Sequence, residues 1–314
     1  MSPERRRRPG RLGAHPERRA LARTLRDALA AAAPPLSLRA RSARRAVVLP
    51  PVVNMFARAS RSAPVVSQAV LGARVAVVKR IPGWALCETG DRYRGWIRAA
   101  ALAADRRDGS LFEVASLFAN VYSERDVTTR APIAVLPILA RVEATPAGGG
   151  EHERTWTRVR LPDGRRGFVQ HADLRPADAP PTPAAERPGR VVATALRFLG
   201  LPYLWGGTTP FGLDCSGLVQ LAHRVHGVFL PRDADLQWAD RRLLSVARGR
   251  LRPGDLVFFG PGKRSITHVG IALGGRAFVN ATTRGVPVVR IDRLEDPGWR
   301  VLWRGARRLP GTRR

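Results

Sequence analysis

The chain has 314 residues, enough for two or three domains that each bury an apolar core. A hydrophobic content of 44% with 25% charged residues is typical of a globular protein, and no run approaches the ~20 apolar residues of a membrane-spanning helix. The net charge of +29, with arginine at 52 of the 54 basic positions, favours contact with an anionic polymer such as cell wall, while no base-reading motif predicts specific nucleic-acid binding.

Residues 1–45 form a basic segment that begins with Arg5-Arg6-Arg7-Arg8. Leucines at a four-residue spacing (Leu21, Leu25, Leu29) predict a single helix over 19–33. Charged residues interrupt this stretch, so it lacks the continuous apolar core of a secretory signal. We therefore expect a flexible segment that contacts an anionic cell-wall polymer. We also expect a cytoplasmic protein, with the cell envelope or secretion as the alternative.

Residues 46–177 contain a sequence repeat with an offset of 72 residues. Trp84, Gly95 and Leu102 of the first copy match Trp156, Gly167 and Leu174 of the second. Each copy alternates short apolar runs with turn residues, which predicts a small all-β barrel. The two copies, 46–106 and 107–177, resemble paired bacterial SH3-like domains. A single irregular β-domain explains the matched offsets poorly.

The first of the two cysteines of the chain, Cys87, follows Trp84 in the first copy. It is interpreted as structural, because two cysteines in separate domains make no disulfide framework. Residues 178–189 contain four prolines and little apolar content, which indicates a semi-rigid linker. Residues 190–199 then predict a short helix.

The residues around Cys215 carry the chemistry of the C-terminal region. A Gly- and Pro-rich stretch ends in Asp214-Cys215-Ser216-Gly217, and apolar residues then recur at spacings of three and four over 218–228. This pattern predicts a loop followed by an amphipathic helix, with Asp214 as N-cap and Cys215 in the first turn. Backbone N–H groups at a helix start stabilise a thiolate, so Cys215 is a candidate nucleophile. A buried structural cysteine is the alternative, which the polar neighbours of Cys215 disfavour.

A candidate base and its orienting group follow on two predicted strands. His268 begins an alternating apolar run that closes in Gly274-Gly275, and Asn280 lies twelve residues after His268 on the next strand. The two side chains are therefore expected to face each other. The order Cys, His, amide is that of papain-like enzymes, in which the third side chain fixes the tautomer and orientation of the imidazole.

Five motifs in this region resemble those of the NlpC-type cysteine peptidases, which hydrolyse peptide stems of bacterial cell walls. They are Leu201-Pro202-Tyr203-Leu204-Trp205-Gly206-Gly207, Asp214-Cys215-Ser216-Gly217-Leu218-Val219, Leu230-Pro231-Arg232, Leu251-Arg252-Pro253-Gly254-Asp255-Leu256-Val257-Phe258-Phe259 and His268-Val269-Gly270-Ile271. Asn280 stands where the family often has histidine, and its amide oxygen can still accept from the imidazole. The resemblance implies an α+β papain-like catalytic domain over 190–314, following the two SH3-like barrels. The stretch from Trp299 to Leu309 is expected to be the strand that closes its sheet.

The resemblance implies an endopeptidase that cleaves the bond between γ-D-glutamate and a diamino acid, without a cofactor or metal. Cys215 would attack, His268 would transfer the proton, and the backbone N–H of Cys215 would stabilise the oxyanion, with the Tyr203 hydroxyl as a further donor or, alternatively, packed against Trp205. Asp214 and Ser216 would help to hold a free amino terminus of the stem peptide. A non-catalytic wall-binding protein and a Cys-His wall amidase are the rival functions.

A tyrosine of the first SH3-like copy is the last candidate site residue. In relatives with this layout the first SH3-like domain closes the far end of the cleft, and a tyrosine before Gly-Trp contributes to the amine pocket. Asp91-Arg92-Tyr93-Arg94-Gly95-Trp96 fits that pattern and nominates Tyr93, whereas the second copy has Arg165 at the matching place. Packing of Tyr93 beside Trp96 is the alternative. The expected partners are peptidoglycan stem peptides or muropeptides, and the expected state is a monomer.

Overall fold

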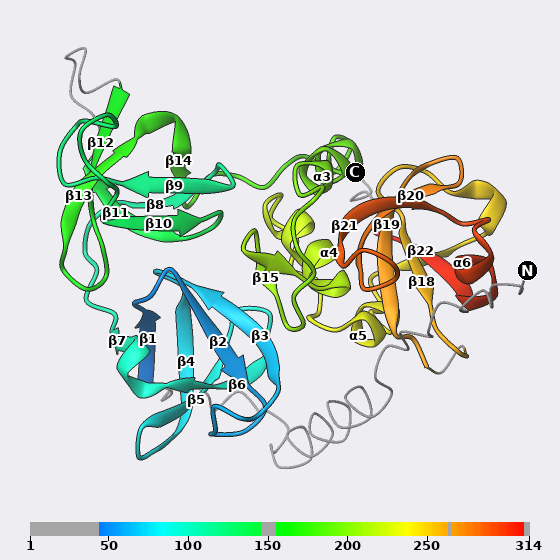
Figure 1. Cartoon of the computed structure of the whole chain (residues 1–314), viewed down its shortest axis with the longest axis horizontal. Coiled ribbons are helices and arrows are strands. Elements are labelled where there is room, and N and C mark those ends of the chain that lie inside the picture. The colour runs from blue at the N-terminus through cyan, green and yellow to red at the C-terminus, as the bar shows by residue number, and fades with distance from the viewer. Residues whose placement is uncertain (1–43, 146–154, 263–264, 311–314) are drawn as a thin grey trace, which may run out of the picture.

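The computed structural model describes residues 44–145, 155–262 and 265–310. Two β-domains lie beside a C-terminal domain that contains the main helices (Figure 1). Residues 1–43 of the basic segment, with the expected helix over 19–33, lie outside the described residues, whereas Arg44 and Arg45 belong to the first strand of the first β-domain. No helix in the described ranges is long and apolar enough to cross a membrane.

The first β-domain is a strongly curved antiparallel sheet in the order β3-β2-β6-β5-β4-β1-β7. Alternate residues of these strands point into one core that contains Val48, Met55, Ala85 and Ile97. The strands are β1 (Arg44–Val48), β2 (Val52–Phe56), β3 (Val65–Val70), β4 (Arg74–Ile81), β5 (Trp84–Glu88), β6 (Arg94–Arg98) and β7 (Leu102–Ala104).

The last three strands of the second β-domain repeat those of the first at the predicted offset of 72 residues. A five-stranded sheet in the order β13-β12-β11-β8-β14 lies beside a β10-β9 pair, around a separate core. The strands are β8 (Leu111–Val114), β9 (Phe118–Val121), β10 (Ala134–Pro137), β11 (Arg141–Thr145), β12 (Trp156–Arg160), β13 (Arg166–Gln170) and β14 (Leu174–Pro176).

Matched aromatic pairs and glycines show that the two β-domains are built alike. Phe56 meets Trp84 edge-to-face at 5.6 Å, and Tyr122 meets Trp156 in the same way at 5.7 Å. A Cβ on Gly95 would lie 2.8 Å from the Cβ of Met55, and a Cβ on Gly167 would lie 2.6 Å from a backbone oxygen. Both repeats therefore require glycine where these strands cross.

The C-terminal domain packs helices on a six-stranded antiparallel sheet in the order β17-β22-β18-β19-β20-β21. The central helix α4 contacts β19 and β20, and it lies between this sheet and the two β-domains (Figure 1). The elements are α3 (Arg187–Leu196), β15 (Thr208–Thr209), β16 (Gly212–Leu213), α4 (Cys215–Arg224), α5 (Ala234–Trp238), β17 (Leu244–Val246), β18 (Leu256–Phe259), β19 (His268–Gly274), β20 (Ala277–Thr282), β21 (Val288–Arg293), α6 (Pro297–Leu302) and β22 (Trp303–Arg308).

Three boundaries differ from the expectation from sequence. Helix α3 begins at Arg187 rather than at 190, because Pro188 is acceptable in a first helical turn. Helix α4 ends at Arg224 rather than near 228, since Gly227 has the left-handed backbone conformation, with a φ of +79°, that often ends helices. The segment expected as one closing strand from Trp299 instead forms α6 before β22, which inserts beside β18 inside the sheet.

Candidate active site

Cys215 is the first residue of α4 and is 8% exposed. Asp214 caps the helix, because its side chain accepts a hydrogen bond of 2.7 Å from the backbone N–H of Gly217. A Cβ on Gly217 would lie 2.0 Å from the backbone oxygen of Gly207, so the motif requires glycine two residues after the cysteine. The Gly-rich loop and the helix start thus lock together and fix the position of the thiol.

His268 and Asn280 face each other on β19 and β20, as their spacing predicted. Nε2 of His268 lies 2.9 Å from Oδ1 of Asn280, and the exposed fractions are 8% and 0%. An amide oxygen only accepts hydrogen bonds, so Nε2 carries a proton and donates a hydrogen bond to Oδ1 of Asn280. Nδ1 is then the ring nitrogen that can act as a base in the neutral imidazole.

Asp292 on β21 orients the amide of Asn280, a role that the sequence did not indicate. Nδ2 of Asn280 donates to Oδ2 of Asp292 at 3.1 Å and to the backbone oxygen of Arg290 at 3.3 Å. Because both acceptors hold the NH₂ side, Oδ1 is turned toward His268. Arg290 in turn forms an ion pair with Asp292 at 2.9 Å.

Trp299 of α6 stacks on the imidazole of His268, with ring centroids 4.8 Å apart and an interplanar angle of 27°. Arg284 lies over Trp299, with its guanidinium 5.1 Å from the ring centroid. Sequence reasoning missed Trp299 because that segment was expected to be a strand. The stacked indole restricts the imidazole to the plane in which it meets Asn280.

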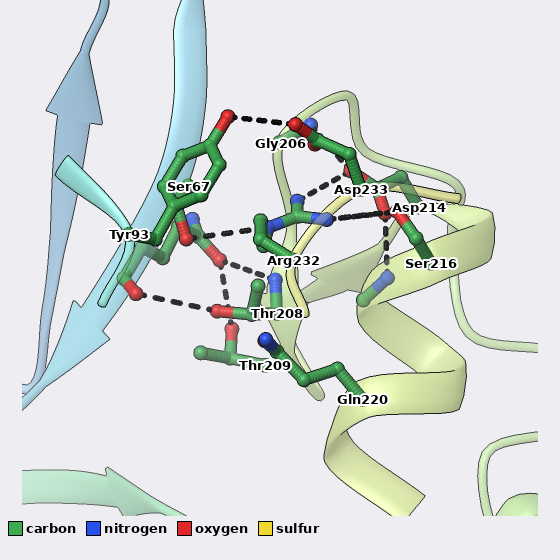
Figure 2. A network of polar contacts seen from close by, with 12 residues as sticks. Ser67, Tyr93, Gly206, Thr208, Thr209, Asp214, Ser216, Gln220, Arg232 and Asp233 are labelled. Atoms are coloured by element: carbon green, nitrogen blue, oxygen red, sulfur yellow. Dashed lines mark hydrogen bonds and ion pairs between the residues drawn. The ribbon is translucent and has the colours of Figure 1, made fainter. Parts of the chain in front are cut away.

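Asp214 is held by Arg232 in a buried ion pair (Figure 2). Nη1 of Arg232 donates to Oδ1 at 3.0 Å and Nη2 donates to Oδ2 at 2.5 Å. Oδ1 also accepts from Ser216 at 3.1 Å, and Oδ2 accepts from the backbone N–H of Gly206 at 3.0 Å. Burial alone would lower the pKa of Arg232, but the charge and hydrogen bonds of Asp214 raise that pKa above its usual value. The carboxylate of Asp214 is therefore fully engaged within the protein.

The hydroxyl group of Tyr93 contacts the carboxylate of Asp233. The Tyr93 hydroxyl, from the first β-domain, donates to Oδ2 of Asp233 at 3.1 Å (Figure 2). Asp233 directly follows Arg232 in the Leu-Pro-Arg motif, and the side chain is partly buried. The motif was recognised in the sequence, but Asp233 was not selected as a site residue.

Further contacts hold the first β-domain against the C-terminal domain at this place. Nε of Arg232 donates to Ser67 at 3.2 Å, and Nε2 of Gln220 donates to Asp91 at 2.8 Å. The backbone N–H of Thr208 donates to Gln68 at 3.0 Å. These bonds fix the loop that carries Tyr93 against α4.

The remaining predicted residues have distinct surroundings. Ser216 is 5% exposed and its hydroxyl also accepts from Arg232 at 2.9 Å. Tyr203 is partly buried against the core of the C-terminal domain, and its backbone N–H donates to Pro287 at 2.8 Å. Cys87 is fully buried in the core of the first β-domain, where burial raises the pKa of its thiol to about 11 against the opposing charge of Arg80.

Comparisons with protein-family models match two parts of the chain. Residues 200–308 match the NlpC/P60 family, and residues 55–102 match a bacterial dipeptidyl-peptidase Sh3 domain. Both resemblances found in the sequence are confirmed over these residues. That residues 107–177 form a second SH3-like domain stays a prediction.

Curated proteins and a solved structure are similar to larger parts of the chain. Dipeptidyl-peptidase 6 of Lysinibacillus sphaericus is 30% identical over 262 residues, which are 80% of this chain and 92% of that protein. The γ-D-glutamyl-L-lysine dipeptidyl-peptidase of Bacillus cereus is 37% identical over 156 residues, 48% of this chain, and the match spans only 45% of that relative's length. An NlpC/P60 family protein from Bacillus cereus has the same fold, with a TM-score of 0.72 at 24% identity over 85% of this chain and 100% of that one.

Proposed function

Since the chain belongs to the NlpC/P60 family, we propose that it is a cysteine hydrolase of peptidoglycan stem peptides that cleaves the bond between γ-D-glutamate and a diamino acid. The hydrogen bond from Nε2 of His268 to Asn280 carries this proposal, because it leaves Nδ1 as a base in the domain whose helix α4 presents Cys215. The name of the Bacillus cereus relative specifies a γ-D-glutamyl-L-lysine bond, which supports this choice of bond.

The reaction is an acyl transfer through the thiol. Nδ1 of His268 takes the proton of Cys215, and Sγ forms a bond with the γ-carbonyl carbon of the glutamate. The backbone N–H of Cys215, at the start of α4, stabilises the oxyanion. His268 then gives its proton to the amine of the diamino acid as the C–N bond breaks. Water, deprotonated by His268, hydrolyses the thioester and regenerates the thiol.

We assign the recognition of a free amino terminus to Asp233 and Tyr93. The sequence nominated Asp214 for this ammonium, but both of its oxygens accept from Arg232. Asp233 presents a second carboxylate at the place where the first β-domain meets the C-terminal domain, with Tyr93 as its neighbour. The relatives named dipeptidyl-peptidases support this arrangement, because release of a dipeptide requires a free amino end.

The proposal is tested by digesting the synthetic peptide L-Ala-γ-D-Glu-L-Lys-D-Ala and weighing the products. We expect the dipeptide L-Ala-D-Glu and the peptide L-Lys-D-Ala from the wild type and no products from Cys215→Ala. Cys87→Ala is the matched control, because it removes the other thiol, and it should retain activity. Retained hydrolysis in Cys215→Ala would contradict the mechanism.

A muropeptide with the stem still attached to its sugar separates the rival functions. Cleavage between the sugar lactyl group and L-Ala would identify an amidase instead. Binding of the free peptide L-Ala-γ-D-Glu-L-Lys-D-Ala without any cleavage, by a protein whose circular dichroism spectrum shows the intact fold, would identify a wall-binding protein.

A further inference from the structure

A cavity of about 190 Å³ lies where the two β-domains and the C-terminal domain meet. Three arginines from three different domains line it: Arg74 of the first β-domain, Arg141 of the second and Arg224 at the end of α4. Among the residues that the structure describes, Asp91 is the only acidic one in the lining. The cavity is far larger than the ~10–15 Å³ that one water molecule needs, so it has room for a polyatomic ion.

Two of the three arginines already have carboxylate partners. Arg74 forms an ion pair with Asp105 at 2.5 Å, and Arg141 forms one with Glu113 at 3.2 Å. Glu113 is shared with Arg175 at 2.7 Å, so one carboxylate serves two guanidinium groups on that side. The second β-domain therefore contributes a net positive charge to the junction.

Arg224 has no such partner among the described residues. Its guanidinium forms no ion pair and no hydrogen bond there, and it stacks over the ring of Phe229 at 5.5 Å from the centroid. The side chain is only partly exposed. Burial lowers the pKa of Arg224 below its usual value, although the charge of Asp91 opposes this shift. Arg224 lines the cavity without a carboxylate partner among the described residues, so an anion in the cavity would supply the acceptor that its guanidinium lacks there.

Asp91 does not take the place of this anion. Its Oδ2 accepts from Gln220 at 2.8 Å, and its Oδ1 accepts from the Thr89 hydroxyl and, at 3.4 Å, from the backbone N–H of Tyr93. The carboxylate is thus turned toward the loop and α4. It lowers the positive potential of the cavity without neutralising all three arginines.

From this geometry we propose that the junction cavity binds a small oxyanion of the phosphate class, with Arg224 as its main ligand and Arg74 and Arg141 contributing charge. A tetrahedral oxyanion has several acceptor oxygens and can meet guanidinium groups that approach from three domains. The bound ion links these domains. The site is distinct from the proposed catalytic residues, so its test needs no activity measurement.

The test measures binding of inorganic phosphate by calorimetry, with chloride used to hold the ionic strength constant. We expect one phosphate per chain, and roughly 10- to 100-fold weaker binding in Arg224→Gln, as for loss of a charge-assisted contact. The phosphate affinity of Arg224→Lys should be intermediate, since lysine keeps the charge but lacks the parallel N–H donors of the guanidinium group. Arg125→Gln is the matched control, because Arg125 stacks over Phe168 at 5.2 Å on an exposed surface away from the cavity.

Because the protein has a net charge of +29, the Arg125→Gln control is needed to distinguish a specific site from general attraction of anions. Equal losses in Arg224→Gln and Arg125→Gln would mean diffuse attraction of anions to a highly basic protein and would overturn the site. Glycerol 3-phosphate is compared with inorganic phosphate in the same assay. Tighter binding of the ester assigns the site to a phosphate ester, tighter binding of the free ion assigns it to phosphate, and failure of both to bind overturns it.

Thermal melting gives a second readout that does not depend on calorimetry, because the melting temperature is compared with and without phosphate. In chloride alone, Arg224→Met should melt no lower than the wild type, because the substitution removes a cation that lacks a partner. Phosphate should raise the melting temperature of the wild type and leave that of Arg224→Met unchanged. The same rise in both proteins would contradict the assignment even if the glutamine variant did not fold.

Discussion

The guanidinium of Arg232 donates hydrogen bonds to both carboxylate oxygens of Asp214, the residue directly before Cys215. The side chain of Arg232 is only 1% exposed. Asp214 at the same time caps α4 and anchors the Gly206 loop. One carboxylate thus joins the Leu-Pro-Arg motif, the Gly-rich loop and the helix of Cys215. Arg232 also reaches Ser67 of the first β-domain.

Breaking this pair should destabilise the fold strongly. We expect Arg232→Met to lower the free energy of unfolding by about 3–5 kcal/mol, because it leaves a buried carboxylate without its partner. Urea unfolding measures the loss. Arg276→Met removes the exposed partner of Glu295 and should cost less than about 1 kcal/mol. Equal losses in the two variants would show that the Arg232 pair is screened by water.

Cys87 should give the stability a pH dependence of defined sign. Its folded pKa is raised to about 11, whereas a thiol in an unfolded chain has a pKa of about 8.5. Between these values the unfolded state binds fewer protons than the folded state, so stability falls as the pH rises, by up to about 1.4 kcal/mol per unit. Urea unfolding between pH 8 and 10.5 should show this slope in the wild type and a smaller one in Cys87→Ala. Identical slopes would place the Cys87 thiol in contact with water.

The residues behind His268 should act on turnover in a graded way. His268→Ala should lower kcat by about 10²–10⁴-fold, because it removes the proton carrier. Asn280→Ala and Asp292→Ala act through the orientation of the imidazole, so each should lower kcat by about 10- to 100-fold with little change in KM. Asn280→His should keep activity, since a ring nitrogen can still accept from Nε2.

The control for this series is Glu295→Ala, which removes a carboxylate near the end of β21 that contacts arginines and not Asn280. It should leave the rate unchanged. Wild-type turnover in Asn280→Ala would mean that another group orients His268.

The proposed amine site should make hydrolysis depend on a free amino terminus. Acetylation of the L-Ala amine should lower kcat/KM by about 10- to 100-fold in the wild type, because Asp233 then loses an ionic partner at a partly buried position. Tyr93→Phe should reduce this preference, and Asp233→Asn should reduce it further. Rates on the free and acetylated peptides are compared for each variant.

Arg165→Ala is the matched control for Tyr93, because Arg165 stands at the corresponding position of the second β-domain, where it pairs with Asp163 at 2.8 Å. Its substrate preference should equal that of the wild type. If the wild type hydrolyses both peptides equally, the amine site is ruled out and the enzyme cuts stems that are still attached to sugar.

Deletion of residues 1–43 tests the basic segment as a tether. We expect weaker binding to an anionic wall polymer and a flatter salt dependence. The truncated protein has fewer arginines, so its binding releases fewer counterions from the polymer. Turnover of the small peptide should be unchanged. Cosedimentation with cell walls at several salt concentrations measures the first effect, and loss of peptide hydrolysis would show that the segment belongs to the fold.

The sequence by itself was sufficient for features that depend on local pattern. The helix that begins at Cys215, the strands of His268 and Asn280 and the 72-residue repeat follow from periodicity, capping and spacing, and the structure places them as expected. These features are determined by neighbours along the chain, so one sequence contains the information for them. The identity of the bond cleaved came from the family resemblance and stays a proposal.

Only the tertiary structure decided which polar groups meet. Tyr93 and Asp233 are 140 residues apart, and Arg232 and Ser67 are 165 apart, so no periodicity relates them. From sequence, Asp214 was compatible with two roles, helix cap and ammonium ligand, and the position of Arg232 in space restricts it to the first. A carboxylate binds whichever cation the fold brings within about 3 Å, and that distance is set by the packing of three domains.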